Sequence, residues 1–258
     1  SSSAEELVDV VAQPIEVPQT DIERERSTPW QSTDEAMTTL ESLIERGEGV
    51  TLEELETLYP FPLDPFQREA TRALLKGESV VVAAPTSSGK TLVGEAAAVA
   101  MLSKRKKLIY TTPLKALSNQ KLLEFQDRFG QTRVGLRTGD TALQLESDVV
   151  VMTTEILRNM LYNFDDERWQ DVGAVVLDEV HYLGDPHRGT VWEECIIYAP
   201  RTVQLVCLSA TVGKPHQLSE WISSIREEEC KLVKSARRPV PLKWLFSQRT
   251  PRHLPPGT

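Results

Sequence analysis

The chain has 258 residues, of which 40% are hydrophobic and 26% charged, with a formal net charge of −9; this composition is ordinary for a globular protein and argues against a fibrous or wholly disordered one. No apolar run approaches the roughly 20 residues that cross a bilayer, so no membrane partner is expected. Three scattered cysteines, Cys195, Cys207 and Cys230, form no CxxC pair, a pattern that favours reduced thiols and an intracellular location over a zinc site.

The chain opens with an acidic segment, residues 1–33, whose prolines and lack of periodicity predict disorder. Residues 1–60 carry 15 acidic and 3 basic side chains, which leaves a balance of +3 for residues 61–258. The remainder is mildly basic and therefore permits a polyanion partner without demanding one. A further hypothesis, with no motif behind it, is that the acidic arm docks a partner or shields the basic face from RNA.

Residues 34–60 predict a helical extension. From Asp34 the spacing of Met37, Leu40 and Leu43 is that of an amphipathic helix ending near Gly47. A second short helix follows in "TLEELETLYP" (51–60), which begins with a Thr–x–x–Glu capping box.

After residue 60, short apolar runs alternate with helical patterns such as "TLVGEAAAVAML" (91–102) and "LKALSNQKLLEFQDRF" (114–129). Continuous apolar strands separated by helices predict an α/β fold whose mostly parallel sheet is covered on both faces. Ligands bind such sheets beyond the carboxyl ends of the strands. The predicted strands are 79–84, 107–112, 133–138, 148–153, 174–178 and 203–209.

"APTSSGKT" joins the strand 79–84 to the helix after it. A phosphate-binding loop needs converging backbone N–H groups, a helix N-terminus, a lysine and a hydroxyl for magnesium. Gly89, Lys90 and Thr91 supply the core of this pattern, and Ala84 stands where the general pattern has glycine. The predicted loop also contains Pro85, Thr86, Ser87 and Ser88.

Two adjacent carboxylates, Asp178 and Glu179, end the apolar run 174–178. Adjacent like charges repel, so a solvated loop is the plain interpretation unless a cation or a reaction uses them. Beside a phosphate-binding loop, a nucleoside triphosphatase needs a carboxylate on magnesium and a group that polarises the attacking water. Asp178 fits the first role and Glu179 the second.

These motifs resemble those of superfamily 2 helicases, in the order that the superfamily's first RecA-like domain has them. "DEVH" is similar to motif II, "TTPLKALSNQK" to motif Ia, "RTGD" to Ib, "TTEILRNMLY" to Ic and "LSAT" to motif III. "FPLDPFQ" resembles the adenine-side element, which implies that Phe66 and Gln67 read the base.

"KALSNQK", "DEVHYLGDPHRGTVWEE" and "RRPVPL" are similar to superkiller-type, exosome-associated DEVH-box RNA helicases, and most of all to chloroplast and cyanobacterial members. The resemblance covers about residues 61–246, the expected first RecA-like domain. It implies an ATPase that uses Mg²⁺, translocates on or unwinds RNA, and works with an RNA-processing or degradation complex. The expected compartment is the chloroplast or the cyanobacterial cytoplasm, with the eukaryotic nucleus or cytoplasm as the alternative.

The resemblance also assigns contacts with the backbone of one RNA strand, which carry no base-sequence information. They are Pro113, Lys115, Thr138, Gly139, Thr153 and Thr154. Residues that would couple the ATP site to this surface are His181, Ser209, Ala210 and Thr211.

Motors of this superfamily hold ATP and RNA between two RecA-like domains. Residues 247–258 are expected to lead toward the second domain, and no motif IV, V or VI is present in the sequence. The chain alone is therefore expected to bind nucleotide weakly and not to unwind.

Two rival interpretations stay open: a DNA helicase or translocase of the same superfamily, and a non-catalytic nucleotide-binding scaffold. Two charged stretches, "SKRKK" (103–107) and "REEEC" (226–230), are expected to be solvated surface, although the first could also face RNA.

Overall fold

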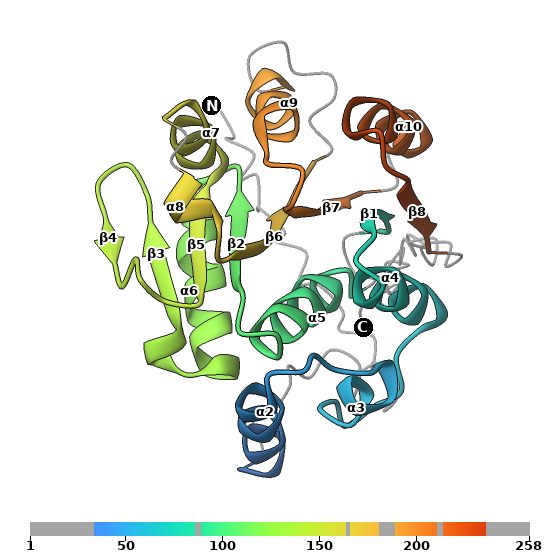
Figure 1. Ribbon diagram of the computed structural model, residues 1–258, viewed down its shortest axis with the longest axis vertical. Coiled ribbons are helices and arrows are strands. Elements are labelled where there is room, and N and C mark those ends of the chain that lie inside the picture. The colour runs from blue at the N-terminus through green and yellow to red at the C-terminus, as the bar shows by residue number, and fades with distance from the viewer. Residues whose placement is uncertain (1–33, 86–88, 164–165, 181–188, 211–213, 236–258) are drawn as a thin grey trace, which may run out of the picture.

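The computed structural model describes residues 34–85, 89–163, 166–180, 189–210 and 214–235. Within these residues one sheet runs in the order β4-β3-β5-β2-β6-β7-β1-β8, and every neighbouring pair is parallel except β3 and β4 (Figure 1). The strands are β1 (Ser79–Ala83), β2 (Lys107–Thr112), β3 (Val134–Arg137), β4 (Ala142–Leu143), β5 (Val149–Thr153), β6 (Val172–Leu177), β7 (Gln204–Ser209) and β8 (Cys230–Lys234).

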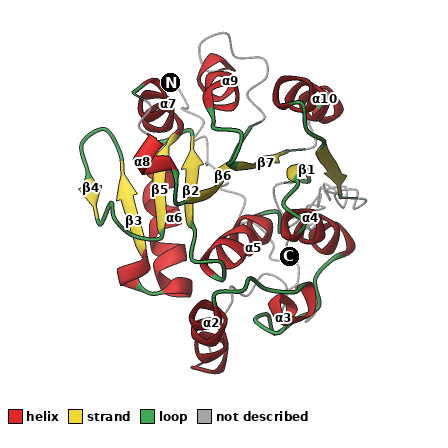
Figure 2. Ribbon diagram, in the orientation of Figure 1, coloured by secondary structure: helices red, strands yellow, loops and turns green. Residues whose placement is uncertain are grey.

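Helices cover both faces of the sheet. In Figure 2, α4, α5 and α6 lie on one face and α7, α9 and α10 on the other, with α2 and α3 beyond α5. The helices are α2 (Asp34–Arg46), α3 (Leu52–Glu56), α4 (Pro65–Leu75), α5 (Thr91–Leu102), α6 (Lys115–Phe129), α7 (Thr154–Tyr162), α8 (Asp166–Trp169), α9 (Gly189–Tyr198) and α10 (Pro215–Arg226), with a 3₁₀ turn η1 (Gln131–Arg133). No helix of the described residues is long and apolar enough to cross a membrane.

The strands read as continuous apolar runs because alternate side chains enter different cores. In β1, Val80 and Val82 join the core beneath α4 and α5, whereas Val81 joins the core beneath α9 and α10. Side chains of a strand alternate between the two faces, so a sheet buried on both faces needs apolar residues throughout. The predicted α/β fold and all six predicted strands are confirmed, while β4 and β8 were not predicted.

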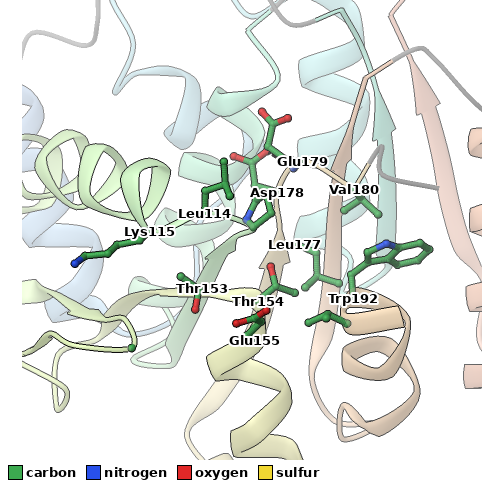
Figure 3. A pocket seen from close by; sticks show the side chains of 13 residues that line it. Leu114, Lys115, Thr153, Thr154, Glu155, Leu177, Asp178, Glu179, Val180 and Trp192 are labelled. Carbon is green, nitrogen blue, oxygen red and sulfur yellow. Dashed lines mark hydrogen bonds between the residues drawn. The ribbon is translucent and has the colours of Figure 1, made fainter. Parts of the chain in front are cut away.

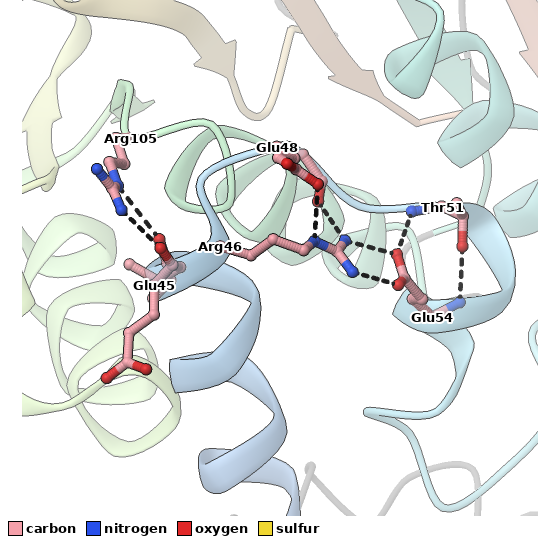
Figure 4. A network of polar contacts seen from close by, with 8 residues as sticks. Glu45, Arg46, Glu48, Thr51, Glu54 and Arg105 are labelled. Carbon is pink, nitrogen blue, oxygen red and sulfur yellow. Dashed lines mark hydrogen bonds and ion pairs between the residues drawn. The ribbon is translucent and has the colours of Figure 1, made fainter.

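The two helices of the 34–60 extension pack against the same core as the sheet. Leu40 and Leu55 are fully buried in the cluster that also contains the α5 side chains. The Thr51–Glu54 capping box forms as predicted, and Arg46 makes a bidentate ion pair with Glu54 (Figure 4). The core is thus continuous across residue 60, and the domain boundary there stays a prediction. The segments 1–33 and 247–258 lie outside the described residues.

The basic stretch 103–107 lies at the amino edge of the sheet, since Lys107 begins β2. Arg105 donates hydrogen bonds to the backbone carbonyls of Ile44 and Glu45 in the last turn of α2 (Figure 4), where cations stabilise a helix. These residues therefore face away from the carboxyl edge, where parallel sheets bind ligands. An RNA-facing role for this stretch finds no support in its position.

The expectation of a solvated "REEEC" is wrong at both ends, because Arg226 and Cys230 are buried with exposed fractions of 3% and 6%. The Arg226 guanidinium donates to four backbone carbonyls of the turn between α9 and β7, one of which, that of Pro200, also accepts the Val203 N–H at 3.0 Å. The accepting residues are Ala199, Pro200, Arg201 and Val203, the last at 2.5 Å.

Arg226→Ala is expected to lower the free energy of unfolding by about 2–4 kcal/mol, because the buried hydrogen bonds to the carbonyls of Ala199 and Val203 are lost together with two partly buried ones. Urea denaturation measures this change. The matched control Arg72→Ala removes an exposed arginine of α4 and should change stability by less than about 0.5 kcal/mol. Equal effects of the two substitutions would show that the Arg226 contacts contribute little.

Candidate active site at the carboxyl edge of the sheet

The sheet order brings the predicted ATP-binding motifs together. Strands β6, β7 and β1 are neighbours, so the residues that follow them meet at one edge. The Ala84 N–H donates to the Ser209 carbonyl at 3.0 Å, and the Val180 N–H donates to the Leu208 carbonyl at 3.0 Å. The loops after these strands are thus linked by backbone hydrogen bonds beyond the ends of the strands. Ala210 follows Ser209 directly and accepts its hydroxyl hydrogen at 3.0 Å.

The predicted phosphate-binding loop lies between the end of β1 and the start of α5. Residues 86–88 lie outside the described part, as do His181 and Thr211, so the predictions for them are untested. Gly89 has φ +81°, a left-handed conformation that glycine adopts at low cost. Thr91 begins α5, and the positive end of a helix can bind an anion. Within the first turn, the N–H groups of Leu92 and Val93 donate to the carbonyls of Gly89 and Lys90 at 3.1 and 3.0 Å.

Lys90 carries a buried ammonium group. Its exposed fraction is 4%, and Nζ has no hydrogen-bond partner among the described residues. Burying an unpaired cation is costly, so the site favours an anion beside Nζ. A nucleotide phosphate has the negative charge and the acceptor oxygens to fill this role. The environment of Lys90 is therefore suited to binding ATP.

The start of α4 is tied to the phosphate-binding loop. Gln67 Nε2 donates to the Gly89 carbonyl at 3.0 Å, and Gln67 Oε1 accepts the Asp64 N–H at 2.8 Å. Gln67 is 5% exposed, and Phe66 is 6% exposed within the hydrophobic core. Gln67 thus holds the loop in place. Base reading by Phe66 and Gln67 stays a prediction.

The two carboxylates follow β6 as the sequence indicated. Asp178 Oδ2 accepts a hydrogen bond from the Tyr110 hydroxyl at 2.6 Å, and Asp178 Oδ1 accepts the Glu179 N–H at 2.8 Å. Burial, and then the charge of Asp178, raise the pKa of Tyr110 well above its usual value, so the phenol remains a donor. Glu179 has φ +60°, a strained conformation that non-glycine residues adopt mainly at functional sites.

The donors at this edge also suit magnesium. The described residues contain no cluster of three or more His, Cys, Asp or Glu that could hold a metal alone. Magnesium is usually held by one or two protein oxygens and by substrate phosphates. The Asp178 carboxylate and the Thr91 hydroxyl are oxygens of this kind, so the residues fit Mg²⁺ bound together with a nucleotide.

A cavity of about 350 Å³ joins the carboxylates to the predicted RNA surface (Figure 3). Five of the six residues predicted to contact RNA line it together with Asp178 and Glu179. The five are Pro113, Lys115, Gly139, Thr153 and Thr154. Thr153 precedes the first turn of α7, where unpaired N–H groups favour a phosphate.

Thr138 lies outside the lining of this cavity and is 5% exposed. Its hydroxyl donates to the Asp140 carboxylate at 3.1 Å, and Lys115 Nζ donates to the other oxygen of that carboxylate at 2.5 Å. The hydrogen bond from Lys115 lowers the pKa of Asp140. Lys115 and Thr138, both predicted to contact RNA phosphates, are therefore already hydrogen-bonded to the carboxylate of Asp140. The motif resemblance assigned no role to Asp140, although "RTGD" contains it.

Tyr110 and Trp192 were also missed. Trp192 lines the cavity and its indole N–H has no acceptor among the described residues. Tyr110 sits inside an apolar run, where an aromatic side chain normally predicts core, and Trp192 next to Val191 has the same plain interpretation. Only the position of Tyr110, immediately before motif Ia, could have drawn attention to it.

Comparison with known proteins identifies the family. The model of the family described as "DEAD/DEAH box helicase" matches residues 64–218. The chloroplastic DExH-box ATP-dependent RNA helicase DExH15 of Arabidopsis thaliana is 56% identical over 207 residues, which cover 78% of this chain and 18% of that protein. The antiviral helicase SKI2 of Saccharomyces cerevisiae is 45% identical, with 72% of this chain and 14% of that protein covered.

Among solved structures, helicase Lhr of Mycobacterium smegmatis, bound to ssDNA and AMP-PNP, aligns with a TM-score of 0.58 and 28% identity over 73% of this chain and 28% of that one. This chain corresponds to less than a fifth of the length of DExH15 and of SKI2. The RecA-like fold and the resemblance to superkiller-type helicases are confirmed. The chain belongs to the DEAD/DEAH box helicase family.

Proposed function

We propose that this chain is the ATP-binding half of an ATP-dependent RNA helicase. One observation carries the proposal: a single cavity is lined by the two carboxylates expected to drive ATP hydrolysis and by five residues expected to hold a nucleic-acid backbone. A motor needs ATP hydrolysis and nucleic-acid binding to influence each other. Residues for both functions line one cavity, so a change at either site can act directly on the other.

Each residue at the ATP site has a defined task in this proposal. Lys90 and the N-terminal end of α5 bind the phosphates. Thr91 and Asp178 would hold magnesium, which when bound neutralises charge on the phosphate oxygens. Glu179 orients the attacking water and accepts its proton.

RNA is the proposed polynucleotide because the relative at 56% identity is named an RNA helicase. The alternative is DNA, since the aligned Lhr structure holds ssDNA. The contacts in both cases would be to the backbone of one strand and not sequence-specific. Binding of matched RNA and DNA strands at one salt concentration separates the two: tighter binding of RNA supports the proposal, and a clear preference for DNA contradicts it.

The longer protein is proposed to supply a second RecA-like domain that completes the ATP site. Its arginines would stabilise charge on the transferred phosphoryl group. This chain alone is then expected to bind ATP without unwinding a duplex, and robust unwinding by it would contradict the proposal. A chloroplast location and association with an RNA-processing or degradation complex are proposed from the DExH15 and SKI2 resemblance.

Asp140→Asn is expected to strengthen binding of single-stranded RNA about two- to fivefold, because Lys115 no longer has to leave a carboxylate to reach a phosphate. Fluorescence anisotropy with a labelled strand measures the affinity. Lys115→Ala should weaken binding and abolish the effect of Asp140→Asn, since the acid acts through that lysine.

The control for net charge is Asp127→Asn, which neutralises an exposed acid of α6 away from the cavity. It should leave the affinity within about 1.5-fold, because exposed charges beyond a Debye length are screened. If both substitutions raised the affinity equally, the Lys115–Asp140 pair would not be the cause.

A further inference from the structure

Tyr110 lies under the carboxylates although no motif includes it. It belongs to β2, is fully buried, and donates its hydroxyl hydrogen to Asp178 Oδ2 at 2.6 Å. The other oxygen, Oδ1, accepts the Glu179 N–H at 2.8 Å. Each carboxylate oxygen can accept two hydrogen bonds or bind a cation with its second lone pair. The two donors therefore fix the rotation of the carboxylate and leave it able to bind a metal.

Strand register explains why this side chain can reach Asp178. In the β2–β6 pair, Tyr110 lies opposite Val176. Neighbours across a sheet project to the same face, as do residues two apart in a strand. Asp178, two residues beyond Val176, thus stands diagonally ahead of Tyr110 on the same face. A phenol is long enough to span such a diagonal.

The ring is held from both sides. A Cβ at position 94 would lie 2.8 Å from Tyr110 Cε2, so only a glycine in α5 leaves room for the ring. On the other side, Phe125 makes an edge contact with the ring centroids 5.0 Å apart, and Lys121 Nζ lies 5.4 Å from the Tyr110 centroid. Gly94 is three residues after Thr91, so the helix that starts at the phosphate-binding loop also sets the position of the ring.

We propose that Tyr110 is a positioning residue whose hydroxyl fixes the Asp178 carboxylate in the orientation in which it binds magnesium together with the nucleotide phosphates. This inference rests on the proposed ATP site. In this role Tyr110 acts through Asp178 and is assigned no contact with the nucleotide. Its contribution is to remove the rotational freedom of Asp178 before the ion arrives, which lowers the cost of ordering on binding.

Tyr110→Phe tests the proposal because it keeps the ring and its packing but removes the hydroxyl. Binding of a fluorescent ATP analogue to the chain is titrated at increasing Mg²⁺, and again in EDTA. The Mg²⁺ concentration for half-maximal binding is expected to rise about tenfold, since a hydrogen bond to a charged group is lost. Affinity in EDTA should stay unchanged, because the phosphate contacts of Lys90 do not involve Tyr110.

Tyr59→Phe is the matched control. Tyr59 is also a buried tyrosine of the same core, and its hydroxyl donates to the carboxylate of Glu95 at 3.3 Å. Removing that hydroxyl should leave the Mg²⁺ dependence unchanged. Gly94→Ala provides a second route, since it displaces the ring without removing the hydroxyl and should also raise the Mg²⁺ requirement.

The outcomes separate this inference from the proposed function. A Tyr110→Phe variant with unchanged Mg²⁺ dependence overturns the positioning role, and so does an equal loss of affinity with Mg²⁺ and in EDTA, which would indicate a general disturbance of the fold. Asp178→Asn serves as the reference for a lost metal ligand and must show at least as large a shift. A wild-type chain that binds no analogue at any Mg²⁺ concentration overturns the ATP site and this inference together.

Discussion

Lys90→Ala is expected to weaken binding of ATP by about 10- to 100-fold, because hydrogen bonds to a charged partner contribute about 1.5–3 kcal/mol. The ammonium is buried and has no hydrogen-bond partner in the described part of the chain, which adds a second expectation. Without nucleotide the variant should be more stable than the wild type by about 1 kcal/mol, since the penalty of an unsatisfied buried cation disappears. Fluorescence titration of a labelled nucleotide and urea denaturation of the ligand-free chain measure the two effects.

A loss of ATP affinity together with a gain in ligand-free stability distinguishes a lysine that binds ligand from one that supports the fold. A lysine that supports the fold would lower the ligand-free stability when removed. Lys104→Ala, at an exposed position beside Gly49 of the extension, is the matched control and should change neither quantity. An unchanged nucleotide affinity in Lys90→Ala would contradict the role assigned to this residue.

Glu179→Gln is expected to reduce ATP hydrolysis about 10²- to 10⁴-fold, the usual contribution of general acid–base catalysis. The amide keeps the shape of the side chain but cannot accept the proton of the attacking water. Nucleotide affinity should stay within about threefold, because Glu179 is assigned no contact with the phosphates. Steady-state hydrolysis by a chain extended through the proposed second RecA-like domain measures the rate.

Glu155→Gln is the control for this prediction. Glu155 lines the same cavity at the start of α7 but is assigned no part in hydrolysis, so its replacement should change the rate by less than about twofold. A Glu179→Gln variant that hydrolyses ATP at a third of the wild-type rate or faster would show that another group activates the water.

The sequence predicted the sheet well because its strands are buried on both faces. Runs such as "SVVVAA" and "DVVVMT" have no interpretation as amphipathic surface helices. The predicted phosphate-binding loop, with its glycine, lysine and threonine, comes after the first of these runs. The carboxylates were found for a related reason: two charges at the end of an apolar run need an explanation.

What escaped prediction depends on contacts between distant residues. β8 lies at the sheet edge and carries Lys231 and Lys234, so its apolar signal is weak. In the sequence, Arg226 is a charged residue beside three glutamates, so it is expected to be exposed like them. In the structure its guanidinium donates to carbonyls of a turn 23–27 residues earlier. Tyr110 is indistinguishable from a core aromatic until the register of β2 and β6 places it beneath Asp178.

The helical extension shows the same limit. Its two helices and the capping box were predicted from local patterns, because amphipathic spacing and caps are local signals. That the helices bury Leu40 and Leu55 in the core of the sheet could not be predicted, since an apolar stripe does not identify its partner.

The thermal unfolding midpoint of this chain, with and without Mg²⁺-ATP, tests the central claim most directly. A nucleotide at 100 times its dissociation constant stabilises the folded state by about 2.7 kcal/mol, which for a domain of this size raises the midpoint by about 5–10 °C. Such a rise is expected in the wild type, and its loss is expected in Lys90→Ala. No rise in the wild type at saturating millimolar Mg²⁺-ATP would contradict the claim that this chain carries a working ATP site.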